Sequence, residues 1–310
     1  MLGLGEIASE FRFERSFARA QRQMSVSEGV TNLARFFSTH PLTQDSTFGA
    51  WRRFVWWQIR SRIRNEVTFK WIEGQRLVVQ RGMAGATGNI YVGLHEFADM
   101  MLPLHFLRAG DTFLDVGANI GSYTVLAAGV RGAKTWAFET DPVTAGALRR
   151  NIEINGLSNL VEVHEIALGD EDGVASFTTG MDAVNHIAQD GGHNLRQVPI
   201  RRLDSLLGAE RPIMIKIDVE GYEEFVIRGA ERLLGDDTLK IIELETVSRQ
   251  TEDTLRRHGF ERVFYAPFRR TLTDQPNEFP ANNSVFARDL DFVTKRLATA
   301  PAVTIHGKAI

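Results

Sequence analysis

The sequence predicts a doubly wound α/β fold, in which helices cover both faces of a mostly parallel sheet. From about residue 106 onward, short apolar runs typical of strands alternate with stretches typical of amphipathic helices. The run "IMIKIDVE" at 213–220 is almost continuously apolar, as expected of a strand that a parallel sheet buries on both faces. A glycine bend in "FLDVGANIGSYTVLAA", residues 113–128, joins a strand to a helix and brings backbone close to a ligand.

The elements of this sheet follow one another in a regular order. The expected strands are 112–117, 134–139, 160–168, 213–220 and 239–245, with terminal strands at 262–268 and 283–288. The expected helices are 121–130, 141–156, 222–235 and 251–259. The helix at 141–156 is clearly delimited, because Asp141 is a good N-cap, Pro142 suits the first helical position and Gly156 stands just past the end.

Residues 1–65 are expected to form an N-terminal helical extension. "SVSE" at 25–28 fits a capping box for one helix, and a second helix is expected over 48–64. That second helix places an apolar row (Trp51, Phe54, Val55, Ile59 and Ile63) opposite Arg53, Arg60 and Arg64. Its arginines and tryptophans suit a membrane surface or a lipid-linked substrate. We favour instead a helix that packs on the main domain or on a second subunit.

Residues 66–105 are expected to form a hairpin and a connector that covers the cofactor. Two β-rich runs break at Glu73–Gly74, which predicts the hairpin. The glycine-rich "RGMAGATGN" at 81–89 lacks the Gly-Lys-Ser/Thr ending of a phosphate loop, so we interpret it as a flexible connector. The sheet domain is expected over 106–290 and a C-terminal tail over 291–310.

Composition limits the classes of function. The 310 residues carry a net charge of -3, which gives no support for broad electrostatic binding to nucleic acid. The absence of cysteine excludes disulfides and thiolate chemistry. No signal core or run of apolar residues long enough to span a membrane is present, so we expect a soluble cytoplasmic protein.

The glycine bend favours S-adenosylmethionine over a dinucleotide. Three residues separate Gly117 from Gly121, so the G-x-G-x-x-G spacing of a dinucleotide site, and with it a nicotinamide dehydrogenase, is excluded. Asp115 would repel a pyrophosphate but suits a ligand with an ammonium group. Glu139 ends the next strand, where an acid can accept hydrogen bonds from both ribose hydroxyls.

Four blocks of the sequence together resemble the FkbM-family methyltransferases. They are "FLDVGANIGSYTVLAA", "AFETDPVTAGALRRNIEINGL", "IALGDEDG" and "IMIKIDVEGYEEFVIRGAERLL", and the likeness covers roughly residues 90–250. The resemblance implies a class I, S-adenosylmethionine-dependent fold that often methylates hydroxyls on sugars, glycans or polyketides. It implies cofactor contacts from three groups: Asp115, Gly117, Ala118, Asn119 and Gly121 at the methionine part, Glu139 at the ribose, and Ala167, Leu168 and Asp170 near the adenine. Tyr91 and Glu96, which precede the bend, are further candidate contacts.

The candidate catalytic residues follow the fourth expected strand. Lys216, Asp218 and Glu220 alternate along it and therefore share one side. We expect Asp218 to accept the proton of the acceptor hydroxyl, with Glu220 orienting that acceptor. The alternative is that Asp218, with Glu220 or Glu245, holds a divalent cation such as Mg²⁺.

Histidines and further acids are secondary candidates. Glu243 lies two residues before Glu245 on the fifth expected strand. His186 and His193 lie in an insertion that is expected to overhang the pocket, and His95 precedes the glycine bend.

We expect a small-molecule or saccharide acceptor, no nucleic-acid partner, and a possible homo-oligomer through the N-terminal helices. Two alternatives stay open: an RNA or other N- or O-methyltransferase of the same fold, and a binding module that keeps the fold without the chemistry.

Overall fold

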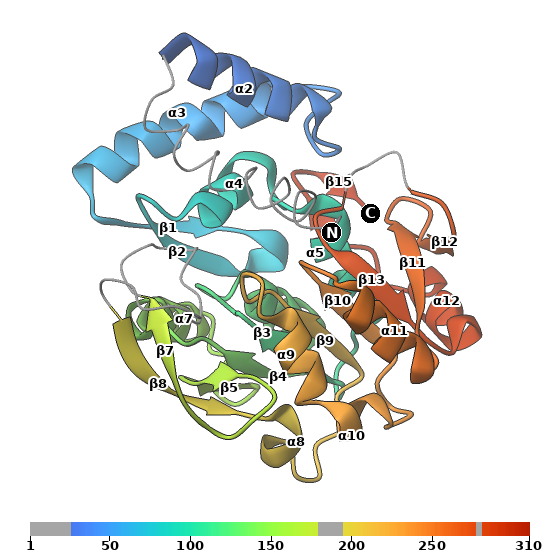
Figure 1. Ribbon diagram of the computed structural model, residues 1–310. Helices are drawn as coiled ribbons and strands as arrows, with labels where there is room; N and C mark the ends of the chain where they lie inside the picture. The colour runs from blue at the N-terminus through green and yellow to red at the C-terminus, as the bar shows by residue number, and fades with distance from the viewer. Residues whose placement is uncertain (1–25, 179–194, 277–280) are drawn as a thin grey trace, which may run out of the picture.

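A computed structural model describes residues 26–178, 195–276 and 281–310, and its centre is an eight-stranded sheet (Figure 1). The strand order is β12-β11-β13-β10-β9-β3-β4-β5. The parallel strands are β3 (Thr112–Val116), β4 (Lys134–Phe138), β5 (Val161–His164), β9 (Met214–Ile217) and β10 (Ile241–Leu244). At the other end of the sheet, β13 (Ser284–Ala287) pairs antiparallel with both β10 and β11 (Glu261–Ala266), so β11 runs in the direction of the parallel strands, and β12 (Thr271–Thr273) pairs antiparallel with β11. The predicted doubly wound, mostly parallel α/β fold is confirmed.

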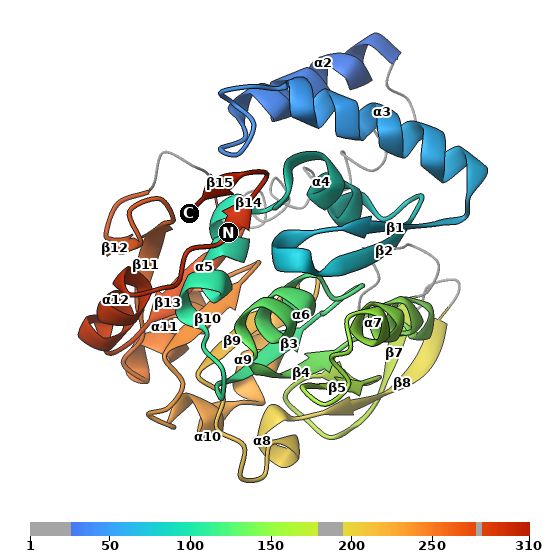
Figure 2. The same cartoon turned by 180° about the vertical axis from the view of Figure 1, so that it is seen from behind.

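Helices cover both faces of the sheet, which explains the apolar strands. Phe113, Met214 and Ile241 pack on one face under α5 (Phe97–Phe106), η2 (Leu126–Val130) and α12 (Leu290–Ala298). On the opposite face, Leu114, Ile215 and Ile242 pack under α9 (Glu223–Arg228), α10 (Glu231–Leu234) and α11 (Arg249–Arg257). The remaining helices near the sheet are α6 (Ser122–Val125), α7 (Pro142–Ile154) and α8 (Leu203–Leu206) (Figure 2).

The strand order reverses between β3 and β9. From β3 the chain winds outward through β4 to β5, whereas β9 and β10 lie on the other side of β3. Such a switch point leaves a crevice beyond the carboxyl ends of the two central strands, where ligands bind in open α/β sheets. The glycine bend after β3 and the acidic segment after β9 both end at this crevice.

The N-terminal region forms two helices and a hairpin at one end of the molecule, where α2 (Val26–Thr39) and α3 (Phe48–Ile63) lie beyond α4 (Ala84–Val92) in both views (Figures 1 and 2). The predicted hairpin is confirmed as β1 (Glu66–Lys70) and β2 (Arg76–Gln80), joined through the short η1 (Ile72–Gly74). The capping box that we expected at 25–28 begins outside the described residues.

One prediction for this region is wrong. The glycine-rich stretch is not a flexible connector, because Ala84–Val92 is helical, with Ala86, Ile90 and Val92 buried. Small residues allow this helix to lie close to the rest of the fold. Val55, Ile59 and Ile63 of α3 share one side, as the sequence indicates, but that side is exposed, and the helix packs through Ala50, Trp57 and Ser61 instead.

Two predicted elements are interrupted. The third strand ends at His164, and Ala167–Leu168 (β6) pairs instead with β8 (Leu195–Arg201) in a separate sheet that also contains β7 (Gly173–Thr178). The helix expected over 222–235 breaks between α9 and α10 at Gly229, which packs so tightly that a Cβ there would lie 1.9 Å from the carbonyl oxygen of Gly169.

The segment expected as a tail forms α12 and a hairpin, β14 (Thr304–Ile305) with β15 (Lys308–Ala309), and Ile305 is fully buried.

Candidate functional site

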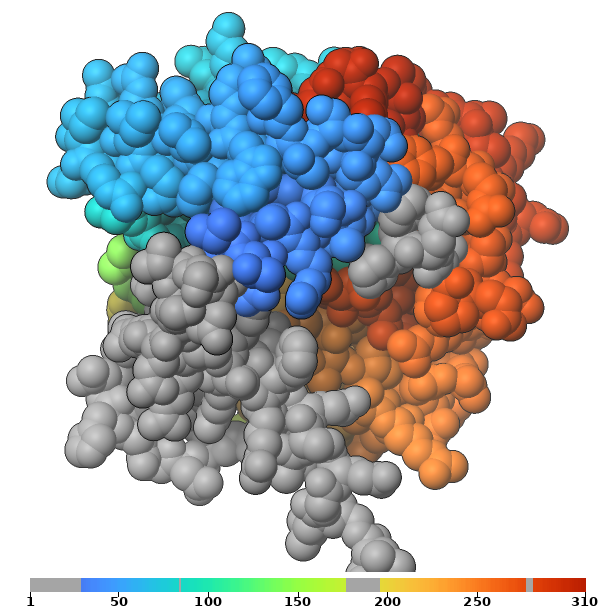
Figure 3. Space-filling view, turned by 90° about the horizontal axis from the view of Figure 1, so that it is seen from above, coloured from blue at the N-terminus to red at the C-terminus, as the bar shows by residue number. Residues whose placement is uncertain are grey.

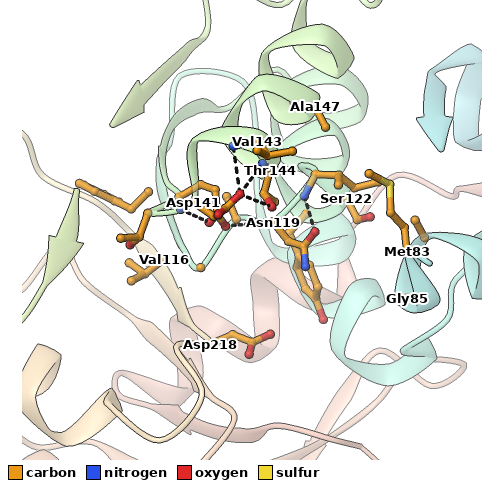
Figure 4. A pocket seen from close by; sticks show the side chains of 18 of the residues that line it. Met83, Gly85, Val116, Asn119, Ser122, Asp141, Val143, Thr144, Ala147 and Asp218 are labelled. Atoms are coloured by element: carbon orange, nitrogen blue, oxygen red, sulfur yellow. Dashed lines mark hydrogen bonds between the residues drawn. The ribbon is translucent and has the colours of Figure 1, made fainter. Parts of the chain in front are cut away.

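A cavity of about 740 Å³ lies at the switch point. Its walls come from the turns after β3, β4, β9 and β10, from the start of α7, and from the β2–α4 segment. Figure 4 shows this arrangement: Asp141, Val143 and Thr144 lie on one side, Met83, Gly85 and Ser122 gather on another, and Asp218 lies across from Val143 and Thr144. The volume falls in the range of sites for cofactors and small molecules.

The glycine bend lies along the cavity wall, and its shape depends on Gly117. This residue has φ +78°, and a Cβ atom there would lie 1.8 Å from the carbonyl oxygen of Asp218. Only glycine allows the turns after β3 and β9 to approach this closely. Gly117, Ala118 and Asn119 line the cavity.

Glu139 lines the cavity at the end of β4, where the bend fixes its carboxylate. The backbone N–H groups of Asn119 and Asp141 donate to its two oxygens at 2.9 and 2.8 Å. Burial raises the pKa of Glu139 to about 7, although these two hydrogen bonds oppose the shift. The remaining lone pairs of such a carboxylate suit the hydroxyls of a ribose.

The cofactor candidates separate into those that line the cavity and those that do not. Ala167, Leu168 and Glu96 line it together with the bend residues. Asp115, Gly121, Asp170 and Tyr91 are not among the lining residues. Each of the three with a polar side chain is engaged elsewhere, as described next.

The residues outside the cavity wall act within the fold. Asp115 is fully buried and accepts a hydrogen bond from Thr124 Oγ1 at 2.6 Å. Asp170 forms an ion pair with Arg228 at 2.9 Å. The Tyr91 ring packs against Phe54, and burial raises the pKa of its hydroxyl to about 12. In sequence, a residue at a strand end cannot be distinguished from one turned beneath the bend.

Lys216, Asp218 and Glu245 form a group of ionisable side chains at the cavity wall, in which Lys216 is buried and the two acids are partly exposed. The Nζ atom of Lys216 donates to Asp218 Oδ2 at 2.8 Å, and the two side chains are 3% and 30% exposed. Burial alone would lower the pKa of Lys216, but Asp218 and Asp115 outweigh it and raise that pKa. Burial likewise opposes ionisation of Asp218, yet Lys216 holds its pKa below the ordinary value.

Glu245 shares a hydrogen bond with Asp218. Its pKa is raised to about 10 by burial first and then by the charge and hydrogen bond of Asp218. Glu245 is therefore the protonated member of the pair at neutral pH, and Asp218 is the carboxylate. Carboxylate oxygens of Asp218, Glu220 and Glu245 all lie within 4.8 Å of one another.

Glu220 lines the cavity in a strained turn. It has φ 55° and precedes Gly221 with φ 90°, so β9 ends at Ile217 and the alternation we used to place Asp218 and Glu220 does not extend to them. Glu223 stabilises this turn by accepting from the N–H groups of Val219 and Gly221 at 3.1 and 3.2 Å.

Several cavity residues were not predicted from the sequence. Asn89 is buried, donates to Ser122 Oγ at 3.2 Å and accepts from the His95 N–H at 2.8 Å. Tyr123 is also buried in the wall and donates to Glu96 Oε2 at 2.9 Å. The helical α4, which the connector interpretation missed, is what brings Asn89 to the site.

The secondary candidates differ in their relation to the cavity. Glu243 is fully buried, does not belong to the lining, and accepts from Asn283 Nδ2 at 2.7 Å. His186 and His193 lie outside the described residues. His95 does line the cavity, and burial lowers the pKa of its imidazole.

Residues 115–264 match the family model described as the methyltransferase FkbM domain. This part of the chain belongs to the FkbM methyltransferase family. The 31-O-demethyl-FK506 methyltransferase FkbM of Streptomyces tacrolimicus is 29% identical over 195 residues, which are 50% of this chain and 74% of that protein. The resemblance predicted from four sequence blocks is thereby confirmed.

Other matches carry different names. The ribosomal protein L11 methyltransferase of Gloeobacter violaceus is 31% identical over 198 residues, which are 56% of this chain and 60% of that protein. A crystal structure of a methyltransferase FkbM from Methylobacillus flagellatus is 15% identical, with a TM-score of 0.41 over 78% of this chain and 61% of that one. The chain spans less than two thirds of the length of either of these two proteins.

These names correct one expectation. We expected a small-molecule or saccharide acceptor and no nucleic-acid partner, but the relatives include proteins named for ribosomal protein L11, and matched solved structures are named rRNA methylases. The exclusion of nucleic acid is therefore wrong, because net charge describes the whole chain and not the acceptor site. Within the described residues, no helix has both the length and the apolar character needed to cross a membrane.

Proposed function

We propose that this FkbM-family protein is an S-adenosylmethionine-dependent methyltransferase that methylates a hydroxyl oxygen. The observation that carries the proposal is that one cavity contains both Glu139, which suits a ribose, and Asp218, which suits a proton acceptor. When bound, S-adenosylmethionine supplies a methyl group that its sulfonium charge makes electrophilic.

The residues present suit this cofactor. The bend at Gly117–Asn119 allows backbone to approach a ligand. None of these three bend residues has a basic side chain that would bind a pyrophosphate. Glu139 would hold the ribose hydroxyls, and Ala167 and Leu168 provide apolar contact for an adenine. Asp115 would act indirectly, by stabilising the bend through Thr124.

Asp218 would take the proton of the acceptor hydroxyl. That hydroxyl becomes strongly acidic as its oxygen bonds to the methyl carbon, so a carboxylate that stays ionised is a sufficient acceptor. Lys216 keeps Asp218 ionised and Glu245 keeps its orientation, while Glu220 would position the acceptor. The protein mainly aligns the reactants, which is the larger part of such catalysis.

Asp218, Glu220 and Glu245 are less suited to bind a divalent cation than Asp218 is to accept a proton. The three acids have the spacing for such a cation. However, the Lys216 ammonium already lies 2.8 Å from Asp218 and would repel a second cation there. We therefore propose a metal-independent reaction.

The acceptor hydroxyl would belong to a sugar, glycan or secondary metabolite, in line with the relative named for 31-O-demethyl-FK506. The second candidate is N- or O-methylation of a ribosomal protein or an RNA, which the name of the Gloeobacter violaceus relative favours.

The decisive experiment measures cofactor binding and then acceptor class. Calorimetry should detect S-adenosylmethionine and its demethylated product, with no comparable affinity for NAD, and Glu139→Ala should weaken binding by about 1–3 kcal/mol. Methyl-labelled cofactor is then incubated separately with hydroxylated small molecules, total RNA and ribosomal protein. Label in an alkali-stable small-molecule ether supports the proposal; label only in RNA or protein selects the second candidate. Absence of cofactor binding contradicts both.

A further inference from the structure

The outer side of α3 carries four exposed apolar and four exposed basic side chains. The apolar residues are Phe48, Val55, Ile59 and Ile63, which are 75%, 52%, 55% and 73% exposed. The basic residues are Arg52, Arg60, Arg62 and Arg64, all of which are exposed. We call these eight residues the α3 surface. We propose that the α3 surface docks the protein on a lipid bilayer that contains anionic lipids.

Within residues 26–178, 195–276 and 281–310, no other element covers this surface. The other side of α3 packs through Ala50, Trp57 and Ser61, and Arg53 Nε donates to the Tyr91 carbonyl at 2.7 Å. These contacts orient the helix on α4 and direct the remaining face outward. In Figures 1 and 2 α3 lies at the end of the molecule away from the sheet, and Figure 3 shows the α2 and α3 segment spread over that end.

The apolar side chains form one row along the helix. Positions 48, 55, 59 and 63 differ by seven, four and four residues, so they project from the same side over four turns. Monomeric proteins rarely leave such a row in water without a use for it. An apolar row of this width can enter the boundary between lipid headgroups and acyl chains.

The arginines match the headgroups of an anionic bilayer. Residues 48–64 contain five basic residues and no acid. Within the described part of the chain, Arg52, Arg60, Arg62 and Arg64 form no ion pair. Their aliphatic stems can follow the apolar row while the guanidinium groups reach lipid phosphates. At about 100° per residue, Arg52 and Arg62 lie within the apolar row, Arg60 lies at its edge, and Arg64 is at the C-cap of the helix, so charge borders the apolar row.

Three other occupants fit less well. RNA would use the arginines but leave Val55, Ile59 and Ile63 in water, because aliphatic side chains offer no ring on which a base can stack. A second copy related by a twofold axis would bring the same arginines together with no acid of this face to neutralise them. Residues 1–25 contain four arginines against three glutamates, so their charge does not complement the surface either.

The experiment is co-sedimentation of the full chain with vesicles of neutral phosphatidylcholine and with the same vesicles containing 30% phosphatidylglycerol. One variant replaces Val55, Ile59 and Ile63 by Ser, and a second replaces Arg52, Arg60, Arg62 and Arg64 by Gln. The matched controls are Val174→Ser and a variant with Arg149, Arg211, Arg249 and Arg256 replaced by Gln, all exposed residues on other elements. Circular dichroism melts check that every variant is folded.

We expect the chain to bind the anionic vesicles at least tenfold more tightly than the neutral ones, with binding weakened by salt. Each α3 variant should bind the anionic vesicles at least tenfold more weakly than the wild type, and the control variants should bind them as tightly as the wild type. The proposal is overturned if the chain binds neither vesicle, or if the serine variant binds as well as the wild type. It is also overturned if the same variants abolish binding to polyuridine RNA, or a dimer seen by light scattering, while vesicle binding is absent. Cofactor binding by calorimetry is independent of these outcomes.

Discussion

The Nζ atom of Lys216 lies 2.8 Å from Oδ2 of Asp218, and the lysine side chain is 3% exposed. Register explains how the sheet accommodates this charge: Asp115 on β3 and Glu243 on β10 flank Lys216 on β9. Three ionisable residues therefore lie side by side across the central strands, all buried. The ammonium group offsets the carboxylates of Asp115 and Asp218, and this arrangement leads to the first prediction.

Replacing Lys216 by Met should destabilise the fold by about 3–5 kcal/mol, because it leaves buried carboxylates without their counter-charge. Urea unfolding measures this loss. The matched control is Lys134→Met, whose ion pair with Glu210 is 46% and 31% exposed and should contribute under about 1 kcal/mol. Equal losses in the two variants would show that the row of charges does not stabilise the sheet.

Asp218→Asn should bind S-adenosylmethionine like the wild type and turn over about 10²-fold more slowly, as expected for loss of a proton acceptor. Calorimetry and a product assay with the identified acceptor measure the two effects. Asp170→Asn is the control, because Asp170 is paired with Arg228 outside the cavity wall. Turnover of Asp218→Asn within about threefold of the wild type would contradict the assigned role.

Chelation should leave the rate of the wild type unchanged. The physical reason is the Lys216 ammonium, which already neutralises Asp218 and opposes a divalent cation among Asp218, Glu220 and Glu245. The measurement is turnover in EDTA, followed by addition of Mg²⁺. If turnover stops in EDTA and recovers with Mg²⁺, the acidic residues hold a metal ion and Asp218 is not the proton acceptor.

The central strands and the order of the blocks were predictable because their signals are local. Asp141, Pro142 and Gly156 each determine one end of α7, and the structure has Asp141 accepting from the Val143 and Thr144 N–H groups. The direction of Asp115 was not predictable, since it depends on Thr124 beneath the bend. Nor was α4, which has no side-chain cap and whose helix depends on burial of Ile90 and Val92.

Cofactor binding should strengthen as pH rises toward about 7. The ribose hydroxyls need the ionised form of Glu139, whose pKa burial raises to about 7. Below that pH a proton must leave before binding, so the dissociation constant should rise up to about tenfold per pH unit. Calorimetry between about pH 5.5 and 7.5 tests this slope, and Glu139→Gln should remove it.

The pH dependence of folding stability has the opposite sign to the pH dependence of cofactor binding. The folded pKa of Glu139 lies above its unfolded value of about 4.5, so the folded state holds the proton more tightly. Without cofactor, the contribution of Glu139 is therefore present below about pH 4.5 and is lost as pH rises through about 7. A free energy of unfolding that rises over this range only in the wild type, and not in Glu139→Gln, would contradict the assignment.

Gly117→Ala should impair the site far more than an equally strained glycine elsewhere. The new Cβ would lie 1.8 Å from the Asp218 carbonyl oxygen, so the turns after β3 and β9 must separate. Gly110 is the control: its φ of +90° resembles the +78° of Gly117, but a Cβ there meets nothing within 4 Å. Gly110→Ala should therefore show only backbone strain, about 1–2 kcal/mol, with normal cofactor affinity. Gly117→Ala should lose more stability than this, and any folded fraction should bind cofactor at least tenfold more weakly, because the bend and Asp218 move together. Similar melting temperatures and affinities for the two variants would show that the close approach of these turns is not required.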